Sequence, residues 1–170
     1  MSYRNQTYVI FDGDEDKWAY GFMLGWIEKD HMAFDFRNAH DLFDIDEDTE
    51  LDEEEVKRTL GKRMLNAKQV IVLVGEKTKN LYKYVRWEIE LALSLELPII
   101  VVNLNDSRRN DNDLCPPLLR SAYAMHVAFR MKIIQYALDN FPAAYAARAT
   151  TRKTGPYYYL DSVYTKLGLL

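Results

Sequence analysis

Two short aliphatic runs constrain the fold of this chain more than any other feature. The first is QVIVLV at residues 69–74, which ends at Gly75, and the second is PIIVV at residues 98–102. Each run is apolar at almost every position, which is typical of a strand covered on both faces. A third run, YVIF at residues 8–11, has the same character and is followed by turn-forming residues. Such strands predict a parallel sheet with helices on both sides.

The segments between these runs show helical periodicity. Apolar residues recur at helical spacing in residues 19–27, after Asp14 or Asp16 as a possible cap, and in residues 52–67, where Asp52 and Glu55 form a plausible capping pair. Residues 84–93 and 131–138 predict two further helices, and residues 32–36 and 123–128 predict short strands. The first helix is expected to bury the following side chains: Ala19, Phe22, Met23, Trp26 and Ile27. The alternation predicts one α/β domain.

The composition of the chain argues against several classes of protein. The 170 residues carry a net charge of −4, and no basic cluster extends beyond two neighbouring cations, which argues against nucleic-acid binding. The single cysteine, Cys115, cannot form an internal disulfide and fits a reducing compartment. No apolar stretch approaches the ~18 residues of a membrane helix, and the N-terminus does not look like a signal peptide. We therefore expect a cytoplasmic protein.

Glu88 interrupts the apolar face of the helix predicted at residues 84–93. At roughly 100° per residue, Glu88 falls about 60° from Val85 on the side of the apolar stripe, whereas Glu90 falls about 140° from it. Glu88 should therefore point inward and Glu90 outward. An inward carboxylate costs desolvation energy unless it is paired or borders a crevice. Two interpretations stay open, namely a functional site and a buried glutamate satisfied by a neighbouring donor.

Several polar segments follow predicted strands and should gather at one edge of the sheet. They are residues 12–14, the region of Asn38, and residues 75–78. No GxGxxG or GxxxxGK[ST] motif occurs, so neither a dinucleotide-type cradle nor a P-loop is indicated. A receiver domain is disfavoured because the third strand ends in Val-Gly-Glu rather than in a phosphorylatable aspartate.

Metal binding has one candidate segment. Residues 44–55 place oxygen ligands at the EF-hand spacings, but Thr49 stands where the turn needs glycine, and no helix is predicted before the loop. A solvated acidic loop leading into a helix N-terminus is the alternative. The three histidines, at 31, 40 and 126, lack metal-ligand spacing. Trp87 is either a surface aromatic or a contact for a partner.

Five stretches together carry a family resemblance. They are YVIFDGD at 8–14, FDFRNAHD at 34–41, VIVLVGEKT at 70–78, VRWEIE at 85–90 and PIIVVN at 98–103. Over about residues 7–105 the chain resembles the bacterial TIR-like family and, more narrowly, the TIR effectors of Thoeris antiphage defence. Residues 129–138 and 159–164 also look like that branch.

The resemblance implies a flavodoxin-like TIR fold that cleaves NAD+ at the nicotinamide–ribose bond with a glutamate on the helix after the third strand. The family's aromatic-x-x-x-Glu pattern places Tyr84 at the aromatic position and Glu88 at the catalytic one. The aromatic is commonly tryptophan, so an alignment on Trp87 and Glu90 is the alternative, which the helical projection disfavours. We expect further substrate-binding residues around the dinucleotide: Phe11, Asp12, Asp14, Asn38, His40 and Tyr84.

The resemblance also implies a domain arrangement and partners. Residues 1–140 should form the TIR-like domain, and residues 141–170 a helical, tyrosine-rich extension packed on it. NAD+ is then the substrate, no metal or other cofactor is needed, and a cyclic ADP-ribose isomer would activate a separate effector. A phage-derived activator and homo-oligomerisation are further expectations. The alternatives are a non-catalytic TIR-like assembly module and an N-glycosidic enzyme similar to nucleoside deoxyribosyltransferases.

Overall fold

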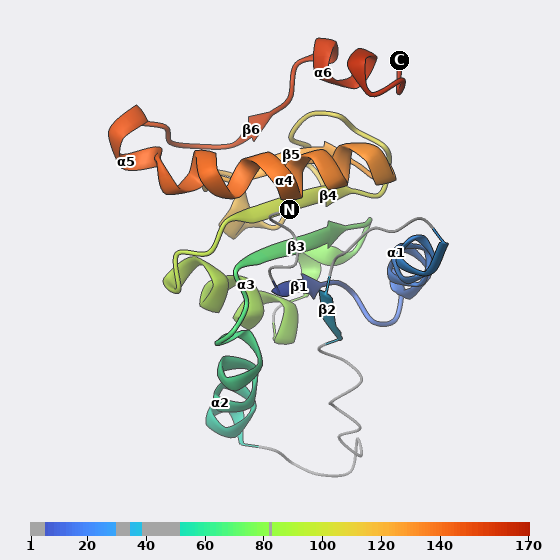
Figure 1. The fold of residues 1–170 in the computed structure, drawn as a ribbon. Helices are drawn as coiled ribbons and strands as arrows, with labels where there is room; N and C mark the ends of the chain where they lie inside the picture. The colour runs from blue at the N-terminus through green and yellow to red at the C-terminus, as the bar shows by residue number, and fades with distance from the viewer. Residues whose placement is uncertain (1–5, 30–34, 39–51, 82) are drawn as a thin grey trace.

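The computed structural model describes residues 6–29, 35–38, 52–81 and 83–170, with the side chains of 35–38 left aside (Figure 1). Six parallel strands form one sheet in the order β2-β1-β3-β4-β5-β6. The strands are β1 Gln6–Ile10, β2 Asp35–Asn38, β3 Gln69–Val74, β4 Ile99–Asn103, β5 Met125–Ala128 and β6 Tyr157–Tyr158. The first five follow the flavodoxin-like order, so the predicted fold class is confirmed.

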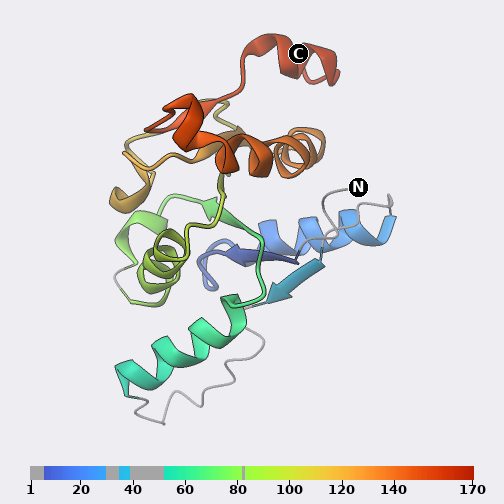
Figure 2. The ribbon, with the colours of Figure 1, turned by 60° about the vertical axis from the view of Figure 1, so that its left-hand side comes forward.

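Helices cover both faces of this sheet (Figures 1 and 2). Helices α1, Lys17–Lys29, and α4, Met131–Ala146, share one apolar core with the sheet. Helices α2, Glu53–Met64, and α3, Tyr84–Ser94, lie on the other face and share the second core. Alternate residues of β1 point to opposite faces of the sheet. Tyr8 and Ile10 belong to the core under α2 and α3, whereas Val9 belongs to the core under α1 and α4.

The central strands are buried as their composition predicts. Every residue of β3 and β4 is buried, because helices exclude water from both faces of these strands. Two short 3₁₀ helices, Thr78–Asn80 and Pro117–Leu119, lie in the loops that follow β3 and β4. No helix among the described residues is long and apolar enough to cross a bilayer.

Two local predictions were wrong. In α1 the side chain of Tyr20 is buried and Phe22 is 58% exposed, the reverse of the expected stripe. The reason is that Tyr20 stacks on Phe11, with ring centroids 4.7 Å apart, so the helix turns this side toward the sheet. The described part of strand β2, Asp35–Asn38, runs two residues past the predicted end at residue 36, which places Asn38 in the strand and not in the following loop. Residues 30–34 lie outside the described part of the chain.

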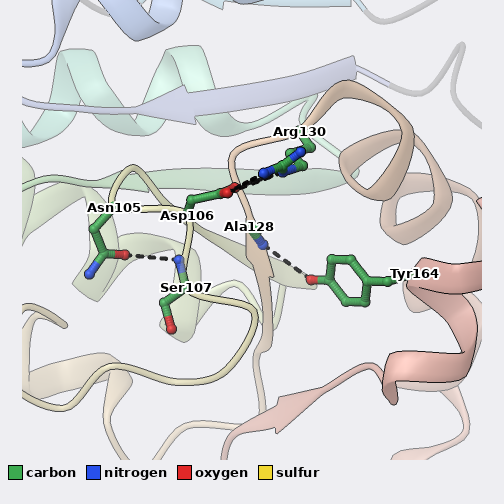
Figure 3. Close-up of polar contacts among 6 residues, drawn as sticks. All are labelled: Asn105, Asp106, Ser107, Ala128, Arg130 and Tyr164. Carbon is green, nitrogen blue, oxygen red and sulfur yellow. Dashed lines mark hydrogen bonds and ion pairs between the residues drawn. The ribbon is translucent and has the colours of Figure 1, made fainter. Parts of the chain in front are cut away.

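The C-terminal extension packs onto the same sheet. Helix α4 continues past residue 140, so the expected boundary falls inside a helix, and it is followed by α5, Arg148–Thr151, by β6 beside β5, and by α6, Asp161–Lys166. In both ribbon views α6 lies at the opposite end of the molecule from α2 (Figures 1 and 2). The hydroxyl of Tyr164 accepts the backbone N–H of Ala128 at 3.2 Å (Figure 3). An ion pair between Arg108 and Asp161, at 2.9 Å, ties α6 to the loop after β4.

Candidate active site

Glu88 lies on the buried face of α3. Its side chain is 2% exposed and shares that face with Val85, Ile89 and Ala92. Glu90 points the other way, is 41% exposed and pairs with Arg86 at 2.9 Å. The inward direction of Glu88 and the outward direction of Glu90 are therefore confirmed. The alternative centred on Glu90 would place the reactive carboxylate in a solvent-exposed ion pair.

The first turn of α3 carries two aromatic rings. Tyr84 begins the helix, is 44% exposed and contacts Trp87 edge to face, with centroids 5.7 Å apart. The ammonium of Lys57, on α2, lies 4.9 Å from the ring of Trp87. Trp87 is thus a half-buried contact between α3 and α2 within the chain, which is a third possibility besides a bare surface aromatic and a partner contact.

Two further polar side chains share the apolar layer of Glu88. Tyr8 on β1 is fully buried, and Arg63 in the last turn of α2 is 9% exposed. Among the described residues, neither the hydroxyl of Tyr8 nor Oε2 of Glu88 has a hydrogen-bond partner. Sequence reasoning missed both residues. The missed signal is that Arg63 continues the buried stripe of Val56 and Leu60, which a search for apolar residues alone passes over.

Burial dominates the electrostatics of this group. It raises the pKa of Glu88 to about 8, while the positive charge of Arg63 acts in the opposite direction. Burial also raises the pKa of Tyr8, and the charge of Glu88 adds to that rise. For Arg63, burial lowers the pKa, whereas Tyr8 and Glu88 raise it. In this arrangement Glu88 is mostly protonated at neutral pH and titrates in the range where a general acid or base is useful.

The loop after β1 holds the aspartates predicted there. Asp12 is 5% exposed, and its Oδ1 accepts the backbone N–H groups of Asp14 at 3.0 Å and Glu15 at 3.3 Å. The side chain of Asp14 is exposed. Phe11 is buried against Tyr20 in the core shared with α1 and α4, on the face of the sheet opposite Glu88.

A buried hydrogen-bonded group joins this loop to the loop after β3. Thr78 donates its hydroxyl proton to Oδ2 of Asp16 at 3.2 Å and accepts the N–H of Gly75 at 2.9 Å. Above this group, Lys77 pairs with Glu15 at 2.6 Å. The gathering of residues 12–14 and 75–78 at one sheet edge is therefore confirmed. The side chain of Asp16, just before α1, accepts the hydrogen bond from Thr78; burial raises its pKa while this hydrogen bond lowers it.

The remaining predicted site residues lie apart from this group or outside the described residues. Asn38 ends β2 in register with Val9, and nothing is described of its side chain. His40 and residues 44–51 of the acidic loop lie outside the described ranges. Asp52 caps α2 by accepting the N–H of Glu54 at 3.4 Å. Within the described residues, no group of three or more His, Cys, Asp or Glu side chains is placed to hold a metal ion.

Comparison with known proteins gives one family. A family model described as "Thoeris protein ThsB, TIR-like domain" matches residues 8–109, which is more than half of the chain. The match contains β1 through β4 together with α1 to α3, and so includes Tyr8, Arg63 and Glu88. No curated protein matches the sequence.

Proposed function

The chain belongs to the Thoeris ThsB TIR-like domain family, and from this premise we propose that it cleaves NAD+ between nicotinamide and ribose, with Glu88 as the catalytic carboxylate. The observation that carries the proposal is the position of Glu88. It lies on the helix after β3, is 2% exposed, and has one carboxyl oxygen without a partner among the described residues. A carboxyl group kept in an apolar layer at a cost to the fold is typical of a functional group.

The chemistry needs little more than one carboxylate. When the bond from ribose C1′ to the pyridinium nitrogen breaks, its electron pair stays on nitrogen and nicotinamide leaves as a neutral base. The ribose then carries oxocarbenium character, which a nearby carboxylate stabilises while it accepts hydrogen bonds from ribose hydroxyls. Attack by water yields ADP-ribose and a proton. Attack by a hydroxyl or base atom of the same ADP-ribose yields a cyclic isomer and a proton.

NAD+ itself favours the reactive form of Glu88. Since the pKa of Glu88 is raised to about 8, the free protein holds most of this group protonated at pH 7. The pyridinium ring carries a positive charge, and a positive charge beside a carboxyl group lowers its pKa. Substrate binding thereby drives out the proton and creates the carboxylate. The side chains that cover Glu88 must move for the ring to reach it, which gives an activator a step on which to act.

We assign the product a signalling role. In a Thoeris-type antiphage system, a cyclic ADP-ribose isomer released by this chain would activate a separate effector, and a phage-derived component would trigger its production. NAD+ is a substrate here, and no metal or other cofactor takes part in the proposed step.

One observation favours a second candidate function, homotypic assembly without turnover. On the outer side of α1, a shallow apolar pocket of about 420 Å³ is lined by Trp18, Gly21, Phe22, Gly25, Trp26 and Lys29. Trp18 is 51% exposed and Phe22 58%. Exposed aromatic rings in one patch are typical of contact surfaces. In that case Trp18→Ala changes the oligomer size and Glu88 is dispensable.

The test compares wild type, Glu88→Gln and the matched control Glu90→Gln, which removes an exposed carboxylate from the same helix. Each purified protein is incubated with NAD+, with and without lysate of phage-infected cells, and nicotinamide and ADP-ribose isomers are followed by mass spectrometry. We expect release by wild type and the control, and at least a hundredfold loss in Glu88→Gln. Equal release by all three overturns the assignment of Glu88. Absence of release in every arm overturns the proposed reaction, and a nucleoside substrate panel then tests the deoxyribosyltransferase-like alternative.

A further inference from the structure

Helix α2 has an arginine, Arg63, at a buried position where the helical pattern predicts an apolar residue. The buried side chains of this helix are Val56, Leu60, Arg63 and Met64, which follow helical spacing. The neighbouring Lys62 is exposed, as cations on helices usually are. Arg63 is therefore turned toward the sheet by the register of the helix. A guanidinium is rarely this buried unless it is paired.

Helix α3 repeats the exception with the opposite charge. Its buried stripe is Val85, Glu88, Ile89 and Ala92, so an acid stands where α2 has a base. The two helices contact each other, and Met64, next to Arg63 on α2, shares one apolar core with Val85, Ile89 and Ala92 of α3. Two ionisable side chains of opposite sign thus enter one low-dielectric layer from adjacent helices. When Glu88 is ionised, the attraction between the two charges is screened less there than in water.

Few other charged or titratable groups face Glu88 from the described elements. Strand β1 contributes Tyr8, which interacts electrostatically with both Glu88 and Arg63. Helix α2 contributes Arg63, and on α3 itself Tyr84 stands one turn before Glu88. No charged or titratable side chain of β3 or β4 is described on this face, whose apolar residues on these strands are Val70, Val72, Val74, Ile99 and Val101. Arg63 is the positive charge that acts on Glu88.

We propose that Arg63 is a positioning residue that holds the side chain of Glu88 by charge and favours its ionised form. The pairing is inferred from the burial of both side chains on adjacent helices and does not depend on the reaction. Its effect on catalysis rests on the proposed function. In the proposed reaction, Arg63 and the pyridinium ring of NAD+ both act by charge on the carboxylate of Glu88. The two positive charges together make ionisation of a buried carboxyl group favourable. Arg63 itself forms and breaks no bond.

The pairing is tested without any enzyme assay. A double-mutant cycle combines Arg63→Met, which keeps an unbranched apolar stem and removes the guanidinium and its charge, with Glu88→Gln. Urea unfolding of the four proteins is measured at pH 5 and pH 9. At pH 9 we expect Arg63→Met to change the unfolding equilibrium constant about fivefold or more beyond its effect in the protein that already carries Glu88→Gln. At pH 5, where Glu88 is neutral, the two effects should be equal. A coupling that is absent at pH 9, or the same at both pH values, overturns the proposal.

A second measurement addresses catalysis. The acid limb of nicotinamide release against pH should move to higher pH in Arg63→Met, return toward wild type in Arg63→Lys, and stay in place in the exposed control Lys62→Met. An unmoved limb in Arg63→Met, with wild type active, overturns the catalytic consequence. If wild type releases no nicotinamide but the cycle shows coupling at pH 9 alone, the proposed reaction fails and the pairing stands. Arg63→Lys also keeps the test decisive if Arg63→Met does not fold.

Discussion

Glu88→Gln should make the protein more stable at alkaline pH, because the carboxyl group is buried against its preference for water. Burial raises the pKa of Glu88 from its usual 4.5 to about 8. The folded state then binds this proton more tightly than the unfolded state does. Stability contributed by the protonated form is fully present below pH 4.5 and is lost as the pH rises through 8. Glutamine has nearly the same shape and has no proton to lose.

The size of the effect follows from the two pKa values. Each pKa unit corresponds to about 1.4 kcal/mol, so the free energy of unfolding of wild type should fall by about 4 kcal/mol between pH 5 and pH 9 relative to Glu88→Gln. For a domain of this size such a change is a large part of the whole stability. Other groups titrate over the same range, but they do so equally in both proteins and cancel in the difference.

The assay is urea unfolding of both proteins at one-unit pH intervals from 5 to 9, followed by circular dichroism. The difference in the free energy of unfolding should be small at pH 5 and grow with pH. Glu90→Gln, which changes an exposed and paired carboxylate, should give a flat difference. A flat difference for Glu88→Gln as well would refute the reasoning, since it would mean that water reaches the carboxylate in the folded state.

Three further outcomes test other parts of the structure. His126 is fully buried, both ring nitrogens lack partners among the described residues, and burial lowers its pKa to about 4. The free energy of unfolding of wild type should therefore fall by about 3 kcal/mol as the pH falls from 6.5 to 4, because the unfolded state binds the proton first. His126→Phe should not show this fall, and urea midpoints measured over an acid titration test the difference. Gly75→Ala would place Cβ 2.3 Å from Oδ1 of Asp16 and should cost about 2 kcal/mol or more in thermal unfolding, whereas Gly61→Ala, with open space around its Cβ, should be neutral or stabilising. Tyr164→Phe leaves the N–H of Ala128 without its acceptor and should cost about 1–3 kcal/mol by chemical unfolding, against little change for the exposed Tyr158→Phe.

The parts of the fold that could be predicted are those that local composition decides. A run such as residues 69–74 can be buried on both sides only in the centre of a sheet, and the stripe of α3 separates Glu88 from Glu90 by angle alone. The failures come from tertiary contacts. Tyr20 is buried because Phe11 offers it a ring to stack on, and nothing in the helix itself distinguishes it from Phe22. Strand β6 has two residues, and its existence depends on the register with β5.

Only one residue of the buried group at the candidate site, Glu88, could be predicted from the sequence. Glu88 was visible because a charge interrupts an otherwise apolar face, and that signal needs only one helix. Arg63 gives the same signal on α2, but basic residues near a helix C-terminus are common and favourable there, so position alone does not mark it. Tyr8 is hidden for another reason, since tyrosine fits an aliphatic strand without breaking the pattern. What identifies both is that, in the folded chain, each is buried and interacts electrostatically with Glu88.

The acid on α3 can be kept in this core because burial holds most of it in the neutral form. The charge of Arg63 lowers the pKa of Glu88, but burial still raises it to about 8, so this buried cation does not offset the loss of water. The free protein therefore rests with this group mostly neutral and the core intact. A second positive charge beside Glu88 would favour its ionisation further, and in the proposed reaction this charge is the pyridinium of NAD+, which disappears when nicotinamide leaves. In the proposed reaction, the loss of this charge would raise the pKa of Glu88 again, so that the group regains a proton and the site returns to the form of the free protein.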